Sequence, residues 1–185
     1  LTLLTVDAAQ AKADYAAVSQ SKAAKDASSI TLLYVEGDAM KEIASRIAQQ
    51  WQKELGAYIS LTPVTEQGLR NAVSSGEYQI ALMPFSSADN SALTMMYSFG
   101  NNGLTLPQTA AQKLDSLLRQ AESSQTDAER AAAIASAEQY LVDEAIVVPI
   151  VESAICYAAR PVVEDVSFLF SSRVLDLAAM GKTGD

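Results

Sequence analysis

Histidine is absent from this sequence of 185 residues, and cysteine occurs once, as Cys156. Because histidine is the commonest general base near neutral pH and the commonest zinc ligand, its absence removes the usual basis of both kinds of site. A single cysteine excludes an internal disulfide and a metal site built from several thiolates. These absences favour binding over catalysis, and the sequence predicts no cofactor and no metal.

Basic residues are scarce as well. The chain has 13 Lys and Arg residues against 22 Asp and Glu residues, for a net charge of −9. Binding to a polyanion requires clustered Lys and Arg side chains that release its counterions. The charge balance therefore argues against nucleic acid as a partner.

Long hydrophobic runs are missing too. No apolar run approaches the roughly 18 residues that a membrane-spanning helix requires. The first residues show no basic region, apolar region and cleavage site in the order of a signal peptide. We therefore expect a mature segment or an excised piece of a longer protein, with any signal peptide or lipid anchor outside this sequence.

The composition is that of a folded domain. Apolar residues make up 49% of the chain and charged residues 19%, which excludes a disordered tail. At roughly 100–200 residues per domain, the length allows one domain or one lobe of something larger. We predict a peripheral helical segment at residues 1–28, one α/β lobe at 29–165 and an irregular segment at 166–185. Asp7 is expected to cap a helix in the first segment.

Strand and helix patterns alternate in the first half of this lobe. Asp38 is expected to cap an amphipathic helix that ends at Gly56, and Gly76 to end the next helix. This order predicts a βαβαβ unit, and therefore a largely parallel sheet with right-handed crossovers. The predicted elements are strand 30–35, helix 38–55, strand 57–64, helix 66–75 and strand 78–83.

The second half of the lobe is mostly helical. The capping-box sequence from Thr126 to Glu129 predicts the start of a helix. Two further strands are expected after that helix, on either side of Glu152 and Ser153, and Pro161 is expected to end the second. The predicted elements are a short apolar helix or turn at 93–99, helix 110–122, a helix from 127, strand 146–151 and strand 154–160.

No catalytic group of residues emerges from these patterns. The carboxylate pairs Glu36 with Asp38 and Asp143 with Glu144 lie at a turn and at a polar helix end, where structural roles are the better explanation. Cys156 lies in an apolar strand pattern, which is typical of a buried, unreactive thiol. The short glycine-containing turns match neither the phosphate-binding nor the dinucleotide-binding fingerprint.

In an open parallel α/β sheet, ligands bind outside the carboxyl ends of the strands. The third of these ends leads into Phe85, Ser86, Ser87, Asp89 and Asn90, which combine an aromatic ring, two hydroxyls, a carboxylate and an amide. Such a group suits stacking on a polar ligand and hydrogen bonding to it. Composition alone favours equally the alternative, in which the polar residues cap the following helix.

The order of these segments resembles the C-terminal lobe of extracellular solute-binding proteins, in the subgroup that serves ABC importers for peptides and nickel. The resemblance covers residues 28 to 165, and each motif is in the expected order. The motifs that carry it are Ile30–Tyr34, Ile43–Gly56, Ile59–Leu61, Ser75–Leu82, Leu114-Asp115 with Leu117-Leu118, Thr126–Arg130, Ala137-Glu138 with Leu141, and Val147–Ile150 before a strand that ends at Arg160-Pro161.

This resemblance implies a fold and a function. The fold would be an α/β lobe of the type II periplasmic-binding-protein class, with a mainly parallel sheet flanked by helices. The whole receptor would capture a peptide or similar small polar solute between two lobes and deliver it to an ABC permease, without catalysis. Its partners would be the ligand, the N-terminal lobe of the same protein and the permease. It would be periplasmic, or extracellular as a cell-surface lipoprotein.

The resemblance also implies a site. Peptide binders of the family carry a Gly-Trp and an Asp-rich loop after the third strand, and the Asp pairs with the α-amino group of the ligand. Phe85 matches the aromatic position, while the acidic position aligns with Ala88 or with Asp89. The aromatic run that the family has after the proline-containing strand is replaced here by Val151–Ser153. The predicted ligand-binding residues are Phe85, Ser86, Ser87, Asp89, Asn90 and Glu152.

Two alternatives remain at this point. The second reading is that the same fold is a sensor or protein-interaction module with no transported ligand, for which altered cleft residues are expected. An enzyme is the third reading, and it would need a desolvated pair such as Glu36 with Glu152.

Overall fold

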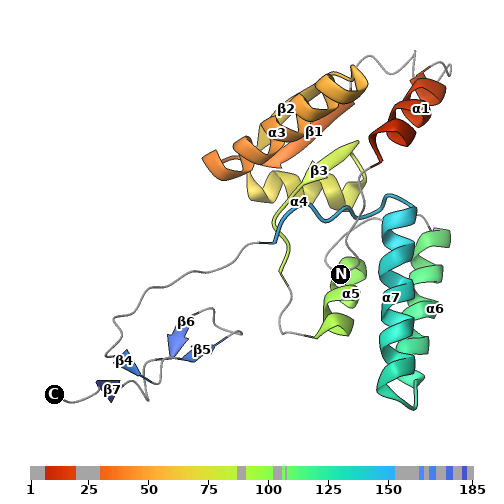
Figure 1. Ribbon diagram of the computed structural model, residues 1–185, viewed down its shortest axis with the longest axis vertical. Helices are drawn as coiled ribbons and strands as arrows, with labels where there is room; N and C mark the ends of the chain where they lie inside the picture. Colours follow the sequence, from red (N-terminus) through yellow and green to blue (C-terminus); the bar gives the residue numbers. More distant parts are fainter. Residues whose placement is uncertain are drawn as a thin grey trace. The chain divides into compact units, whose positions relative to one another are not determined.

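The computed structural model describes residues 7–19, 30–86, 91–101, 106 and 108–152, together with four short strands between residues 163 and 182 (Figure 1). The chain divides into two compact units, which are described separately below. The first comprises Leu1–Phe85 and Phe99–Pro107, and the second comprises Ser86–Ser98 and Gln108–Asp185. Among the described residues, no helix is long and apolar enough to cross a membrane.

The first unit contains a parallel sheet of three strands in the order β2-β1-β3. The strands are β1 (Ile30–Val35), β2 (Ile59–Val64) and β3 (Ile80–Leu82). The register pairs Leu32 of β1 with Leu61 of β2 and with Ile80 of β3. Because β1 lies in the centre with helices packed on it, its sequence is a nearly continuous apolar run, as buried parallel strands require. The predicted βαβαβ unit is confirmed.

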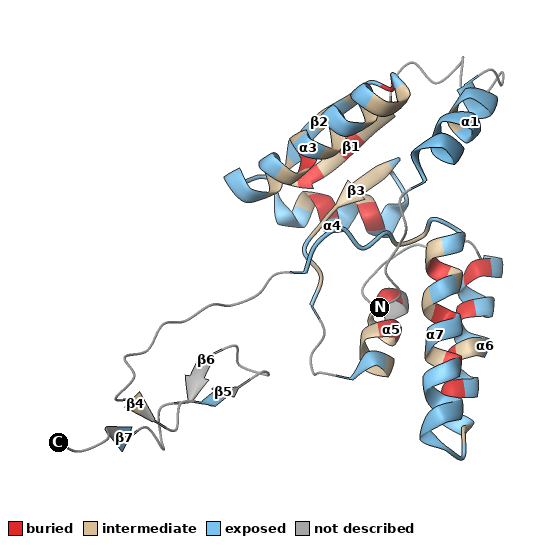
Figure 2. Ribbon diagram, viewed as in Figure 1, coloured by how far each residue is buried: buried red, intermediate tan, exposed pale blue. Residues whose placement is uncertain are grey.

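Helix α3 (Asp38–Leu55) packs on one face of this sheet. Its Ala44 is fully buried against Leu32 and Tyr34, which alternate along β1 and therefore point to the same face. Figure 2 shows these buried positions in red on β1 and α3. Half-buried apolar residues complete this core cluster: Met40, Ile47, Ile59, Leu61, Ile80 and Leu82.

Helix α4 (Glu66–Ser75) connects β2 to β3 and contacts β1. The crossover from β1 to β2 and the crossover from β2 past β1 to β3 run in opposite directions across the sheet, so right-handed connections place α3 and α4 on opposite faces. Leu69 and Val73, four residues apart, are the buried residues of α4.

The ends of these two helices follow the predicted glycines, with one correction. Gly56 and Gly76 adopt left-handed conformations at φ 70° and 73° and end the helices as expected. The N-cap residue of α3 is Gly37, and no side-chain oxygen accepts from the N–H groups of the first turn. Asp38 is instead the first helical residue, where its charge favours the positive end of the helix dipole.

Helix α1 (Ala8–Ser19) packs beside α3 with no buried residue of its own. The backbone N–H of Gln10 donates to Asp7 Oδ1 at 2.9 Å, which confirms the predicted cap. An ion pair of 3.3 Å joins Lys12 to Glu54 of α3. The predicted helical segment covers residues 1–28, of which residues 1–6 and 20–28 lie outside the described part of the chain.

The second unit contains an antiparallel pair of helices, α6 (Gln108–Ser123) and α7 (Asp127–Asp143). A connection of only three residues forces the two helices to lie side by side. The preceding helix, α5 (Ala92–Asn101), is longer than the predicted segment 93–99. Buried positions recur along both helices of the pair (Figure 2): Ala110, Leu114, Leu118 and Ala121 in α6, and Ala133, Ala137 and Leu141 in α7.

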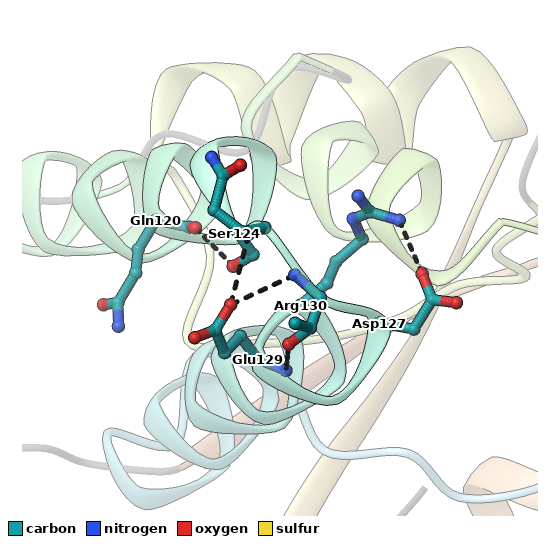
Figure 3. A network of polar contacts seen from close by, with 7 residues as sticks. Gln120, Ser124, Asp127, Glu129 and Arg130 are labelled. Atoms are coloured by element: carbon teal, nitrogen blue, oxygen red, sulfur yellow. Dashed lines mark hydrogen bonds and ion pairs between the residues drawn. The ribbon is translucent and has the colours of Figure 1, made fainter.

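The turn between α6 and α7 confirms the predicted capping box (Figure 3). The backbone N–H of Glu129 donates to Thr126 Oγ1 at 3.2 Å, and Glu129 Oε2 accepts from the backbone N–H of Thr126 at 3.1 Å. The Ser124 hydroxyl donates to the carbonyl of Gln120 at 2.8 Å and satisfies the end of α6. Arg130 pairs with Asp127 at 3.1 Å.

The segment after α7 differs from its prediction. Residues 146–152 contain no regular structure, so the predicted strand 146–151 is wrong as far as this structure describes it. The reason lies at the helix end, where the N–H groups of Ile146 and Val147 both donate to the carbonyl of Leu141, at 2.9 and 3.2 Å. Pro149 removes a third donor from the same segment, which leaves few amides for a ladder. The predicted strand 154–160 lies outside the described residues.

Four short strands form two antiparallel pairs near the end of the chain. Strand β4 (Val163–Glu164) pairs with β7 (Gly181–Lys182), and β5 (Ser167–Leu169) pairs with β6 (Val174–Asp176).

Candidate functional site at the carboxyl edge of the sheet

The carboxyl edge of the sheet is formed where β1, β2 and β3 end. The chain leaves β1 through Glu36 and Gly37, leaves β2 through Thr65, and leaves β3 toward Phe85. Because the strands are parallel, these three exits are at the same edge. Each of the first two exits leads directly into a helix, which leaves no room for a long loop there.

The first two exits are joined by the backbone. The N–H of Glu36 donates to the carbonyl of Val64 at 2.9 Å, one residue beyond β1, so the ladder continues to the very edge. Thr65 Oγ1 accepts from the N–H of Gly68 at 3.1 Å and caps α4. Thr65 therefore has a structural role at this exit, whereas the side chains of Glu36 and Asp38 form no hydrogen bond or ion pair with another described residue.

The charge at this edge is mostly acidic. Glu36 and Asp38 are exposed, and neither forms an ion pair with another described residue. Glu66, in the first turn of α4, is paired with Arg70 one turn later. An edge with unpaired carboxylates and one neutralised carboxylate favours a cationic group over an anionic one.

Phe85 is held by an aromatic contact. Its ring stacks on the ring of Phe99, with centroids 4.4 Å apart and an angle of 17° between the planes. Phe99 is buried, whereas Phe85 is half-buried. One face of the Phe85 ring is therefore covered by protein, and a ligand that stacks on Phe85 has only the other face.

The structure places the remaining predicted site residues only in part. Ser86 is exposed and follows Phe85 directly, while Ser87, Asp89 and Asn90 lie outside the described residues. Glu152 is exposed in the second unit, in the irregular segment after α7.

The other candidates have structural roles or none. Asp143 and Glu144 are exposed at the end of α7, as the sequence predicted. Among the residues that the structure covers, no group of three or more carboxylate or thiol side chains is placed to hold a metal ion. Cys156 falls outside them.

One residue of this site was missed from the sequence. Phe99 supports Phe85, although it lies fourteen positions further along the chain, near the end of α5. The only signal was an aromatic residue at the end of an apolar segment. Such a residue indicates burial without saying which side chain it contacts.

Comparison with known proteins gives matches among structures. No family model and no curated protein matches this sequence. The substrate-binding domain of an oligopeptide ABC transporter from Bacillus anthracis aligns over 98% of this chain and 36% of its own, with a TM-score of 0.71 and 22% identity. The peptide-binding pheromone receptor PrgZ aligns over 98% of this chain and 35% of its own, with a TM-score of 0.69 and 16% identity.

A third structure agrees with these two. The oligopeptide-binding protein OppAIV from Borrelia burgdorferi aligns over 77% of this chain and 29% of its own, with a TM-score of 0.65 and 21% identity. The chain thus spans about a third of the length of the proteins it resembles. It has an α/β fold of the type II periplasmic-binding-protein class, which it shares with these two oligopeptide-transport proteins and the peptide-binding pheromone receptor.

Proposed function

We propose that this chain is the substrate-capture lobe of an ABC-importer solute-binding protein for peptides or a similar small polar solute. The observation that carries this proposal is the acidic carboxyl edge of the parallel sheet. Open α/β sheets bind ligands there. Three structural neighbours that handle oligopeptides or a peptide pheromone share the fold that builds it. The lobe itself performs no chemistry in this proposal.

The acidic edge fits the amino group of a peptide. Glu36 and Asp38 are exposed carboxylates next to the strand ends, and Asp89 follows Phe85 by four residues in the sequence. A carboxylate and an ammonium group attract each other strongly once the cleft closes and water is expelled, because the local dielectric falls. Phe85 contributes its free ring face, and Ser86, Ser87, Asn90 and Glu152 contribute hydrogen-bonding groups.

The proposed division of the chain follows from this role. Residues 29–165 form the ligand-binding lobe and residues 1–28 a peripheral helical segment. Residues 166–185, predicted to be irregular, form a C-terminal segment that contains the short strands β5, β6 and β7. The remaining two-thirds of the receptor supply an N-terminal lobe that closes the cleft, and the closed receptor docks on an ABC permease. The receptor acts outside the cytoplasmic membrane, either in the periplasm or anchored to the cell surface by lipid.

The test is calorimetric titration of the full-length receptor with pools of tri- to hexapeptides. We expect Asp89→Asn to weaken binding at least about tenfold, because the carboxylate's pairing with the amino group contributes about 1.5–3 kcal/mol. Phe85→Ala should weaken it less, since one ring face is already covered. Asp143→Asn is the matched control and should change nothing, because Asp143 is exposed at a helix end.

Two results would contradict the proposal. Unchanged affinity in Asp89→Asn would remove the role given to that residue. Absence of binding to every peptide pool, and to pools of metal chelates and sugars, would favour a sensor or protein-interaction module instead. Binding that survives N-terminal acetylation of the peptides would show that the ligand's amino group is not recognised.

A further inference from the structure

In the part of the chain that the structure describes, no strand pairs with the outer edge of β2. The strand order places β2 at an edge of the sheet. In a parallel ladder, alternate residues direct both N–H and C=O to the same neighbouring strand. The carbonyl of Val64 accepts from Glu36 of β1, so Ser60, Thr62 and Val64 face β1. Ile59, Leu61 and Pro63 therefore direct their backbone groups to the open side.

This edge offers a short, defined set of partners. Ile59 and Leu61 each present one donor and one acceptor, while Pro63 has no N–H and ends the row of donors. Two successive donors on one edge are two residues apart, roughly 6.6 Å in an extended strand. Natural sheets protect such edges with charged side chains or bulges, but β2 has no charged residue. Only its carboxyl half is protected, by Pro63.

A groove runs beside the unprotected half of β2. Its volume is about 210 Å³, and it lies between α3 and the start of β2. Ser45, Gln49 and Gln52 line it from α3, and Tyr58, Ile59 and Leu61 line it from the strand side. No charged residue lines this groove, although the chain carries a net charge of −9.

The side chains of the groove are free to bind. Ser45, Gln49 and Gln52 form no side-chain hydrogen bond with any other described residue. Other glutamines do, for example Gln67 with Asn71 and Gln139 with Asp143. Tyr58 is 74% exposed, the most exposed large apolar side chain in the described part of the chain. Exposed aromatic rings of this kind are frequent anchors of binding surfaces.

We propose that this edge binds an extended, uncharged polypeptide segment that adds as a strand beside Ile59–Leu61. The spacing of the two donors matches the repeat of a second strand, which a sugar or a small solute does not reproduce. The amides of Gln49 and Gln52 hydrogen-bond to the side chains of the added segment, and Tyr58 packs on it. The absence of charge excludes a strongly basic or acidic segment as the occupant. This surface is independent of the proposed ligand site, which lies past the other end of β2.

The test is amide hydrogen exchange of the 185-residue chain, followed by NMR. Without ligand, Ser60 and Thr62 should exchange slowly, and Ile59 and Leu61 rapidly. The probe is a pentapeptide of alternating threonine and valine, acetylated and amidated so that it lacks the terminal charges that the carboxyl edge would recognise. At millimolar concentration it should slow exchange at Ile59 and Leu61 by about tenfold or more.

Variants on one helix give a matched comparison. The double variant Gln49→Ala with Gln52→Ala should lose most of the slowing, and Tyr58→Ala should reduce it. Gln50→Ala should leave it unchanged, because Gln50 is an exposed neighbour that does not line the groove. The four substituted residues are all exposed, so the variants should fold normally: Gln49, Gln50, Gln52 and Tyr58.

Several outcomes would overturn the inference. Equal slowing in the double variant would show that the groove plays no part, and no slowing at about 10 mM peptide would exclude strand addition at a useful affinity. Slowing that rises with protein concentration in the absence of peptide would identify a second copy as the occupant. Slowing by a chitin oligosaccharide but not by the peptide would identify a sugar site.

Discussion

The ring of Phe85 stacks on the ring of Phe99 at a centroid separation of 4.4 Å, so that the exit of β3 is fastened to the end of α5. Nearly parallel rings at this distance are a favourable, offset-stacked arrangement. The contact holds Phe85, which directly precedes the proposed ligand residue Ser86 in the chain. Phe85 therefore contributes to the stability of the fold as well as to the proposed ligand binding.

A double-mutant cycle measures this contact. Phe99→Ala should lower the free energy of unfolding by about 3 kcal/mol, because Phe99 is a buried aromatic residue. Phe85→Ala should cost less, since Phe85 is half-buried. In urea denaturation the two effects should fall short of additivity by about 1 kcal/mol. Additive effects would mean that the two rings stabilise the fold separately.

The capping box of α7 should make stability depend on pH. Hydrogen bonding to the side chain of Thr126, and then to the backbone N–H groups of Thr126 and Gln125, lowers the pKa of the Glu129 carboxyl. A carboxyl whose pKa is lowered by folding adds stability above its unfolded pKa of about 4.3 and loses it as the pH falls through the folded pKa. Denaturation midpoints of Glu129→Gln should therefore approach those of the native chain below pH 4.

The matched control for that experiment is Glu144→Gln. Glu144 is exposed at the other end of α7, where only its backbone N–H takes part in the cap. Its difference from the native chain should vary less with pH. Thr126→Ala should cost about 1 kcal/mol near neutral pH, because an orphan N–H of the first turn loses its acceptor. A pH-independent difference for Glu129→Gln would contradict the assigned hydrogen bonds.

At the ends of α4 and α7, two substitutions between glycine and alanine should change stability in opposite directions. Gly76 follows α4 at φ 73°, with nothing within 4 Å of the position that a Cβ would occupy, so Gly76→Ala should cost about 1 kcal/mol through backbone strain alone. Ala145 follows α7 at φ 52°, a conformation that alanine disfavours. Ala145→Gly should stabilise the chain by up to about 1 kcal/mol, and thermal unfolding would measure both shifts. Destabilisation by Ala145→Gly would mean that unfolded-chain entropy dominates there.

The packing of α4 on the sheet depends on Leu69. It is only 1% exposed, and Leu69→Ala should lower the free energy of unfolding by about 3 kcal/mol. Val18→Ala is the control, because Val18 is 62% exposed on α1 and should change stability by less than about 0.5 kcal/mol. Equal effects of the two substitutions in urea denaturation would place α4 away from the sheet.

Local patterns predicted most of the first unit. The helix over residues 66–75 and the strand over residues 30–35 begin and end where expected, because caps, glycines and apolar spacing are local signals. The cap of α3 was misassigned since Gly37 and Asp38 are both common at such positions, and only the backbone conformation separates them. The predicted strand after α7 failed because a β-rich sequence needs a free edge and free amides.

The sequence by itself determined that no histidine can act as a base or a metal ligand in this chain, because that depends on residue type alone. It also determined the βαβαβ unit, because strands and helices are encoded by short-range spacing. Tertiary structure alone decided which side chains meet. The stacking of Phe85 on Phe99, the joining of Glu36 to Val64 and the open edge beside Tyr58 all connect residues distant in the chain or depend on strand order. Such contacts follow from the register of the sheet and the packing of helices, which no local pattern encodes.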